Sequence, residues 1–132
     1  MLRVPRKLVD AVIDHAYEGY PLEVCGILGG KDGVISSLFR ITNTDREHKH
    51  FIMDPKEQFA LMREMRGADL EMLAIYHSHP DSPPRPTSED ILLAFSPDVS
   101  YVIISLMKLD TPVLKSFRIT AGHPEQEHVE YL

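Results

Sequence analysis

The chain has 132 residues, 43% of them hydrophobic and 26% charged, and a formal net charge of −6 at pH 7. This length predicts one domain, 1–132, whose core needs no disulfide bond, and the single cysteine, Cys25, suits a reducing cytoplasm. The acidic balance gives no electrostatic footprint for nucleic acid or anionic lipid, and no apolar run approaches the roughly 20 residues of a transmembrane helix. We therefore expect a cytoplasmic protein that binds neither nucleic acid nor membrane.

The first third of the chain predicts a helix followed by a β-hairpin. Apolar residues recur at helical spacing over 5–18, and a proline stands in the first turn, where its missing N–H is tolerated. The segment 25–30 has the composition of a central strand, and 31–33 predicts a hairpin turn into a second strand, 34–41. We interpret Cys25 as a small buried packing residue and not as a nucleophile.

The middle of the chain predicts a short strand over 51–53 and then a second helix. Asp54-Pro55-Lys56-Glu57 combines an N-cap aspartate, a proline at the first helical position and a glutamate at the third, so a helix is expected from here to about Arg66. This helix is expected to bury four apolar side chains: Phe59, Leu61, Met62 and Met65.

Two histidines, one residue apart, end an apolar strand predicted over 70–78. Alternate side chains on a strand point the same way, so His77 and His79 project to one face and Ser78 to the other. A proline-rich loop then leads to a helix predicted over 87–95. Its first turn contains Asp90. Two imidazoles and one carboxylate would form a three-ligand site with an open fourth position, an arrangement typical of zinc.

Each half of this pattern also has an ordinary structural explanation. Residues 87–90 fit a helix capping box, with a threonine as N-cap and an aspartate at the third position. A His-x-His pair is weak by itself, and His48 and His50 form a second pair amid charged residues. Because only His77 and His79 follow an apolar strand, we assign this pair to metal and the other to the surface.

The remainder of the chain completes an α/β fold. Strands are predicted over 99–107, 113–120 and 127–132, and the first of these is rich in β-branched residues, as central strands often are. With hairpins and helices both present, we expect a mixed sheet with two main helices packed against it. The histidines near the end, His123 and His128, are assigned to the surface.

The motifs taken together resemble the JAMM, or MPN-plus, zinc isopeptidase family. They are Glu23 before a Cys-Gly strand, His77-x-His79-Pro80, a spacer of six residues, and Thr87-x-x-Asp90. The chain is most similar to the short prokaryotic branch that acts on ubiquitin-like sulfur-carrier proteins, and the similarity covers essentially all of it. The resemblance implies a cytidine-deaminase-like MPN fold, with a mixed sheet flanked by helices. Family members usually have serine where this chain has Thr87.

The resemblance also implies a mechanism. His77, His79 and Asp90 would hold one Zn²⁺ per chain, and Glu23 would act as general base and then as proton donor to the leaving amine. The Thr87 hydroxyl would stabilise the oxyanion, in competition with its capping role. The implied partner is a ubiquitin-like or sulfur-carrier protein with a Gly-Gly tail, cut after its terminal glycine. Which sheet edge would bind the tail, and the oligomeric state, stay open at this point.

Three other classes of protein share part of this pattern. A non-catalytic MPN-type scaffold could retain the metal site, although such scaffolds typically lose the ligands. A non-haem iron oxygenase also uses two histidines and a carboxylate, but in a different order and in a β-helix. An amidohydrolase barrel also begins with His-x-His, but needs ~250 residues.

Overall fold

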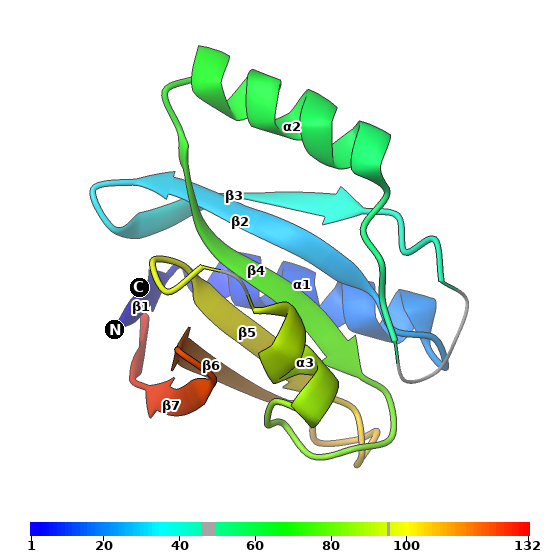
Figure 1. The fold of residues 1–132 in the computed structure, drawn as a ribbon. Coiled ribbons are helices and arrows are strands. Elements are labelled where there is room, and N and C mark those ends of the chain that lie inside the picture. Colours follow the sequence, from blue (N-terminus) through cyan, green and yellow to red (C-terminus); the bar gives the residue numbers. More distant parts are fainter. Residues whose placement is uncertain (46–49, 95) are drawn as a thin grey trace.

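The structure is a computed structural model that describes residues 1–45, 50–94 and 96–132. Within these residues, eight strands form one sheet in the order β7-β6-β5-β4-β2-β3-β1-β8, with three helices packed around it (Figure 1). The helices are α1 (Arg6–Gly19), α2 (Pro55–Gly67) and α3 (Ser88–Leu93). The strands are β1 (Leu2–Val4), β2 (Cys25–Lys31), β3 (Val34–Ile41), β4 (Glu71–His79), β5 (Ser100–Ser105), β6 (Val113–Thr120), β7 (His123–Glu127) and β8 (Val129–Tyr131).

The sheet is mixed, as predicted. Strand β4 pairs antiparallel with β2 and parallel with β5, so it lies in the interior of the sheet. Its register sets Cys25 of β2 opposite His77, and Ser105 of β5 opposite His79. His77 therefore has a paired strand on either side and His79 has one on the β5 side, and the sheet fixes their backbone positions.

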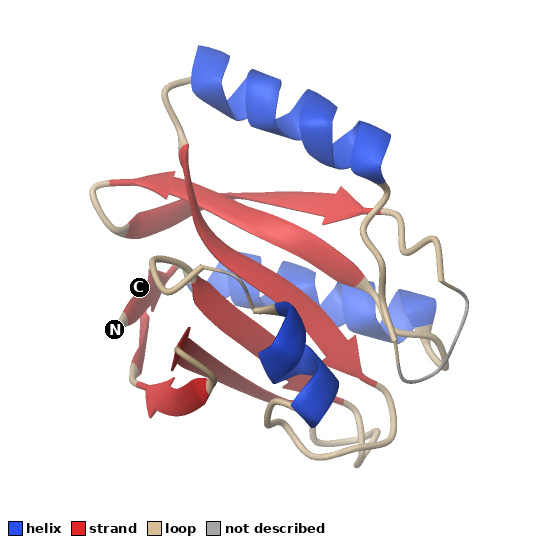
Figure 2. Cartoon of the chain, in the orientation of Figure 1, coloured by secondary structure: helices blue, strands red, loops and turns tan. Residues whose placement is uncertain are grey.

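Helix α1 covers one face of the sheet, and α2 and α3 lie over the other (Figure 2). On the α1 face, the helix packs through Val12 and Ala16 against a cluster that includes Tyr76 of β4. On the opposite face, Leu61 and Met65 of α2 pack on a second cluster that includes Ile75. Successive residues of β4 thus belong to different cores, because strand side chains alternate. None of the described helices is long and apolar enough to cross a membrane.

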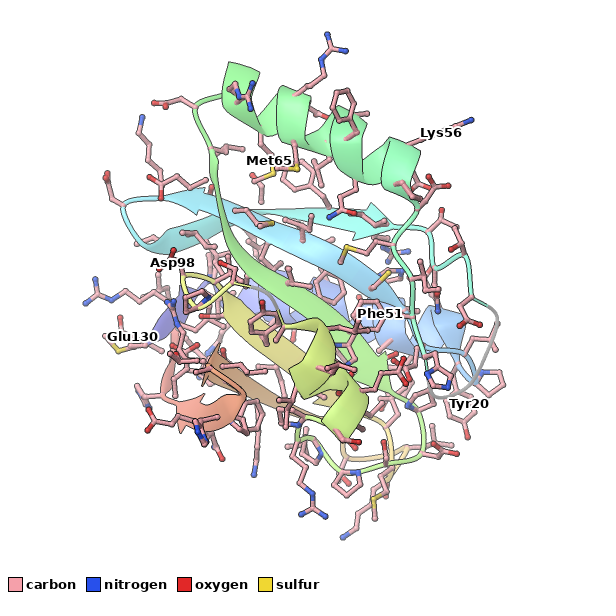
Figure 3. All side chains as sticks on the ribbon, in the orientation of Figure 1. Tyr20, Phe51, Lys56, Met65, Asp98 and Glu130 are labelled. Atoms are coloured by element: carbon pink, nitrogen blue, oxygen red, sulfur yellow. The ribbon has the colours of Figure 1, made fainter. Side chains whose placement is uncertain are left out.

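The predicted burial along α2 was half wrong. Leu61 and Met65 are 6% and 3% exposed, and Figure 3 shows Met65 between α2 and the sheet. Phe59 and Met62, however, are 66% and 48% exposed. The helix contacts the sheet through Leu61 and Met65, which lie four residues apart on one face. The other two apolar residues lie outside this face and are exposed to solvent.

The short elements also differ from the predictions. Helix α3 ends at Leu93, two residues earlier than expected, and residue 95 lies outside the described residues. The strand predicted over 51–53 is reduced to a single bridge between Asn43 and Met53. Two strands were missed, β1 and β7. The second of them follows a turn in which Ala121 and Gly122 both have positive φ.

Candidate active site

Strand β4 ends in two buried histidines whose rings face each other. His77 and His79 are 4% and 2% exposed, and their Nε2 atoms lie 3.1 Å apart. Both project to the α2 and α3 side of the sheet, as the strand alternation predicted. The loop after β4 returns the chain so that Asp90 Oδ2 lies 3.2 Å from His77 Nε2 and 3.1 Å from His79 Nε2.

The histidine rings are held by contacts on their far sides. His79 Nδ1 lies 2.8 Å from the carbonyl oxygen of Pro83 and donates its hydrogen to it, which leaves a lone pair on Nε2. The ring of Phe51 stacks on His77, with centroids 4.6 Å apart and planes inclined by 23°. Burial lowers the pKa of His77 more than the neighbouring Asp90 raises it, so the neutral imidazole that metals bind is favoured.

Asp90 has two structural roles at once. The capping box is present: Asp90 N donates to Thr87 Oγ1 over 3.1 Å, and Thr87 N donates to Asp90 Oδ2 over 3.0 Å. Burial opposes ionisation of Asp90, but its close contacts with His77 and His79 and the bond from this backbone N–H outweigh it and lower the pKa of the carboxyl well below its usual range. The Asp90 oxygen that faces the histidines is therefore also the one that accepts the Thr87 N–H in the capping box.

This geometry removes the competition expected at Thr87. In the cap its hydroxyl oxygen accepts a hydrogen bond, so its own hydrogen stays available to donate. Helix capping and donation to a substrate oxygen can occur together.

Glu23 lies just before β2, and its side chain is 5% exposed. Burial raises its pKa to about 8, with further contributions from the negative charges of Asp90, Glu89 and others. A carboxyl with this pKa exchanges protons near neutral pH, as a general base must. Cys25, two residues further on, is fully buried, and burial raises the pKa of its thiol to about 12. This confirms Cys25 as a packing residue.

Two side chains form hydrogen bonds with the backbone around Glu23. Ser78, on the reverse face of β4, accepts a hydrogen bond from Val24 N over 2.9 Å, and Ser78 N donates to Val24 O. The Asn43 amide donates to Glu23 O over 2.9 Å. The Ser78 side chain thus bonds to the backbone beside Glu23 and not to the metal-ligand group. The role of Asn43 was missed, because nothing in its polar loop sequence marks it.

Of the second histidine pair, His48 and His50, the structure describes His50. His50 is partly exposed, with 41% of its side chain accessible, and its Nδ1 lies 2.7 Å from Glu89 Oε2, so it reaches the first turn of α3 beside Asp90. His48 lies outside the described residues. The polar connection therefore contacts the rim of the site, which the charge pattern alone did not indicate.

The three converging atoms fit a metal ion. A tetrahedral zinc with bonds of 2.0–2.1 Å separates its ligand atoms by about 3.3 Å, close to the 3.1–3.2 Å separations of the His77, His79 and Asp90 atoms. Two imidazole nitrogens that face each other without a hydrogen between them repel, and a cation between them relieves this repulsion. The donor set of two nitrogens and one carboxylate oxygen suits zinc.

Comparison with known proteins identifies the family. The model of the prokaryotic homologues of the JAB domain matches residues 5–120. The CysO-cysteine peptidase of Mycobacterium tuberculosis is 34% identical over 131 residues, which cover 98% of this chain and 90% of that protein. The desampylase of Haloferax volcanii is 31% identical over 103 residues, 73% of this chain and 74% of that one.

Solved structures agree with this result. Protein DSY2949 of Desulfitobacterium hafniense superposes with a TM-score of 0.90 and 38% identity, covering all of this chain and 93% of that one. A JAB1/MPN domain protein of Archaeoglobus fulgidus superposes with a TM-score of 0.65 at 18% identity, covering 100% and 97% of the two chains, and shares the fold. The chain belongs to the prokaryotic JAB-domain family, the branch of the JAMM/MPN proteins that its motifs resemble.

Proposed function

We propose that the protein is a zinc-dependent peptidase or isopeptidase. It would hydrolyse the bond after the C-terminal glycine of a small ubiquitin-like or sulfur-carrier protein. The observation that carries the proposal is the convergence of His77 Nε2, His79 Nε2 and Asp90 Oδ2 to within 3.2 Å of one another, in a chain of the JAB family. We assign these three residues as the ligands of one Zn²⁺ in a single domain, 1–132.

Zinc, when bound, supplies Lewis-acid chemistry that acidifies a water molecule. Glu23 would take the proton from this water and pass it to the nitrogen of the leaving amine. Its pKa of about 8 supports this role, and a cation held nearby would lower that value towards neutrality. Thr87 would donate its hydroxyl hydrogen to the oxyanion that forms at the glycine carbonyl, while it continues to cap α3.

The relatives support the substrate class. Two relatives are named CysO-cysteine peptidase and desampylase, which supports a carrier-protein substrate, and the proposal covers both a peptide bond and an isopeptide bond. We propose a partner with a Gly-Gly tail and a cytoplasmic site of action, where the free Cys25 stays reduced.

The test combines elemental analysis with cleavage of a Gly-Gly-ended ubiquitin-like fusion, comparing wild type with Glu23→Gln. We expect one zinc per chain in both proteins and cleavage only by wild type, with a loss of at least about 10³-fold in kcat for the variant. Zinc in both with no cleavage of any fusion would favour a non-catalytic scaffold, and iron in place of zinc would favour an oxygenase.

Thr87 needs a separate pair of variants. Thr87→Ser keeps the hydroxyl and is the matched control, whereas Thr87→Val keeps the shape and loses both the cap and the donor. If the hydroxyl acts on the oxyanion, Thr87→Val lowers kcat by about 10²-fold with little change in KM. A variant with lower stability and unchanged kcat would leave Thr87 a helix cap only.

A further inference from the structure

A cavity of about 350 Å³ opens directly beside the metal-ligand group. His77 and Asp90 form part of its lining. One wall is the segment 51–53, where Phe51 stacks on His77, and Figure 3 shows Phe51 beside β4. The opposite wall is formed by Leu93 and Ala94 at the end of α3. A group that fills this cavity therefore lies next to the proposed metal ligands.

The lining is mostly apolar and stays open to solvent at its rim. Ile75 and Ile103 form its floor on β4 and β5. At the rim, Ile52 and Leu93 are 55% and 56% exposed although both are large and apolar. Apolar side chains gathered around an open hollow mark a binding surface more often than isolated exposed ones do. The Tyr101 hydroxyl, a polar atom of the lining, is already hydrogen-bonded to the backbone of Ser96. The occupant that fits is an apolar group.

The position of Glu23 shows on which side of the bond the cavity lies. Glu23 is not among the described residues that line it, but lines a separate pocket of about 200 Å³ with Asn43 and Asp45. The group that protonates the leaving amine must reach that nitrogen, so the leaving group lies on the Glu23 side. The acyl half of the substrate, which is the tail of the carrier, then extends towards the apolar cavity.

We propose that this cavity binds an aliphatic or aromatic side chain of the carrier tail, at the residue just before the two glycines. The inference rests on the proposed function, since it assumes that a Gly-Gly tail is the acyl group. Glycines have no side chain, so this residue carries the first side chain available. In an extended tail its Cα lies about 7 Å from that of the last glycine. A 350 Å³ cavity is about 9 Å across if taken as a sphere, and can hold one such side chain.

The first experiment varies that substrate residue. Fusions that differ only in Leu, Phe, Ser or Asp before the Gly-Gly pair are cleaved by wild-type protein, and kcat/KM is measured for each. We expect Leu and Phe to exceed Asp by about 100-fold and Ser by about 10-fold, with most of the difference in KM. Equal kcat/KM for Leu and Asp would overturn the inference.

Two adjacent leucines of α3 give a matched pair of variants. Leu93 lies three residues after Asp90 on the same helix face and lines the cavity, whereas Leu92 is 82% exposed and is not among its described lining residues. Leu93→Asp is expected to abolish the preference for Leu over Asp in the substrate, and Leu92→Asp to retain it. If both variants change the preference equally, the cavity is not the specificity pocket.

A binding experiment separates this inference from the proposed function. Glu23→Gln protein with ¹³C-labelled isoleucine methyl groups is titrated with the free carrier bearing either Leu or Asp before the Gly-Gly pair. The Leu tail is expected to shift the methyl signals of Ile75, Ile103 and Ile119, which line the cavity, and not those of Ile35 in the opposite core. If no fusion is cleaved, the proposed function fails while these shifts still support an apolar tail site. Absence of shifts with both tails overturns the inference.

Discussion

The two faces of the sheet differ in what they bury: one is packed with apolar side chains, and the other holds ionisable groups beside a cavity. The face under α1 is filled by apolar residues, and the one ring-to-hydroxyl contact described there joins His15 Nδ1 to the Tyr76 hydroxyl over 2.6 Å. The face under α2 and α3 holds two buried histidines and borders an apolar cavity of about 350 Å³. One strand, β4, contributes to both faces through alternate residues. Tight packing on one face thus fixes the backbone that positions ionisable groups on the other.

Gly26 gives the largest expected effect, on the packed face. A Cβ at this position would lie 2.3–2.4 Å from the ring and hydroxyl of Tyr76, which is fully buried and bonded to His15. Gly26→Ala is expected to lower the free energy of unfolding by about 3 kcal/mol, measured by urea denaturation. Gly67→Ala is the control, because a Cβ there meets no atom within 4 Å. It should be neutral or stabilising by up to about 1 kcal/mol. A loss below about 0.5 kcal/mol for Gly26→Ala would show that the α1 face is not closely packed.

On the face that carries the histidines, Glu23→Gln is expected to change stability by a similar amount, but the change depends on pH. The pKa of Glu23 is about 8 in the folded protein and 4.5 in the unfolded chain. As pH rises, the unfolded chain loses this proton at a lower pH than the folded protein does, and this favours unfolding. Metal-free wild type should therefore lose stability relative to Glu23→Gln between pH 4.5 and 8, by roughly 3 kcal/mol at pH 7. Thermal unfolding in chelator at pH 5, 6, 7 and 8 measures the difference. A constant difference across this range would mean that Glu23 is not held protonated.

Ser78 connects the two faces, because its side chain points away from the site yet holds the backbone next to Glu23. Ser78→Ala leaves the buried N–H of Val24 without its acceptor, at a cost of about 1–2 kcal/mol. It should also lower kcat more than it raises KM, because Glu23 loses its fixed position. Ser36→Ala, at an exposed position of β3, should change neither by more than about 0.5 kcal/mol. An unchanged kcat would limit Ser78 to a structural role.

His15 gives the smallest expected effect, again on the packed face. Burial, helped by the charge of Arg40, lowers the pKa of His15 to about 4, so the folded protein favours the neutral ring. The contribution of the neutral His15 ring to the free energy of unfolding is complete above pH 6.5 and is lost as pH falls towards 4. Because the ring is only half-buried, we expect wild type to lose about 1 kcal/mol relative to His15→Gln between pH 7 and pH 5. Parallel unfolding curves at the two pH values would contradict this expectation.

Sequence patterns predicted the elements that depend on neighbouring residues. The strand over 34–41 and the start of α2 were placed correctly, since a hairpin turn and an Asp-Pro helix start are local signals. The common direction of His77 and His79 followed from strand alternation, and the first turn of α3 followed from the capping box. The meeting of Asp90 with the two histidines depends on the proline-rich loop between them. The sequence predicted this meeting from the strand, the loop and the helix start, and the family resemblance supported it.

Features that depend on distant partners were not predictable. Strand β1 has three residues, and its partner β8 lies at the other end of the chain. Burial of Leu61 but not of Phe59 depends on which row of α2 meets the sheet. The His50–Glu89 contact and the apolar cavity arise only when segment 50–53 lies against α3, and no local pattern encodes that approach.

The place of β1 in the sheet has a consequence for the order of assembly during synthesis. Strand β1 makes one pairing with β3, at Arg3 and Val34, but three with β8, including Leu2 with Val129 and Val4 with Tyr131. Strand β1 is therefore held mainly by β8, the described strand that is synthesised furthest after it, and gains most of its pairing only when β8 has emerged from the ribosome. Strands β2 to β5, which surround the histidines, pair with one another and can do so before β8 is synthesised. A nascent chain could thus assemble the strands around the two histidines before β1 and β8 pair.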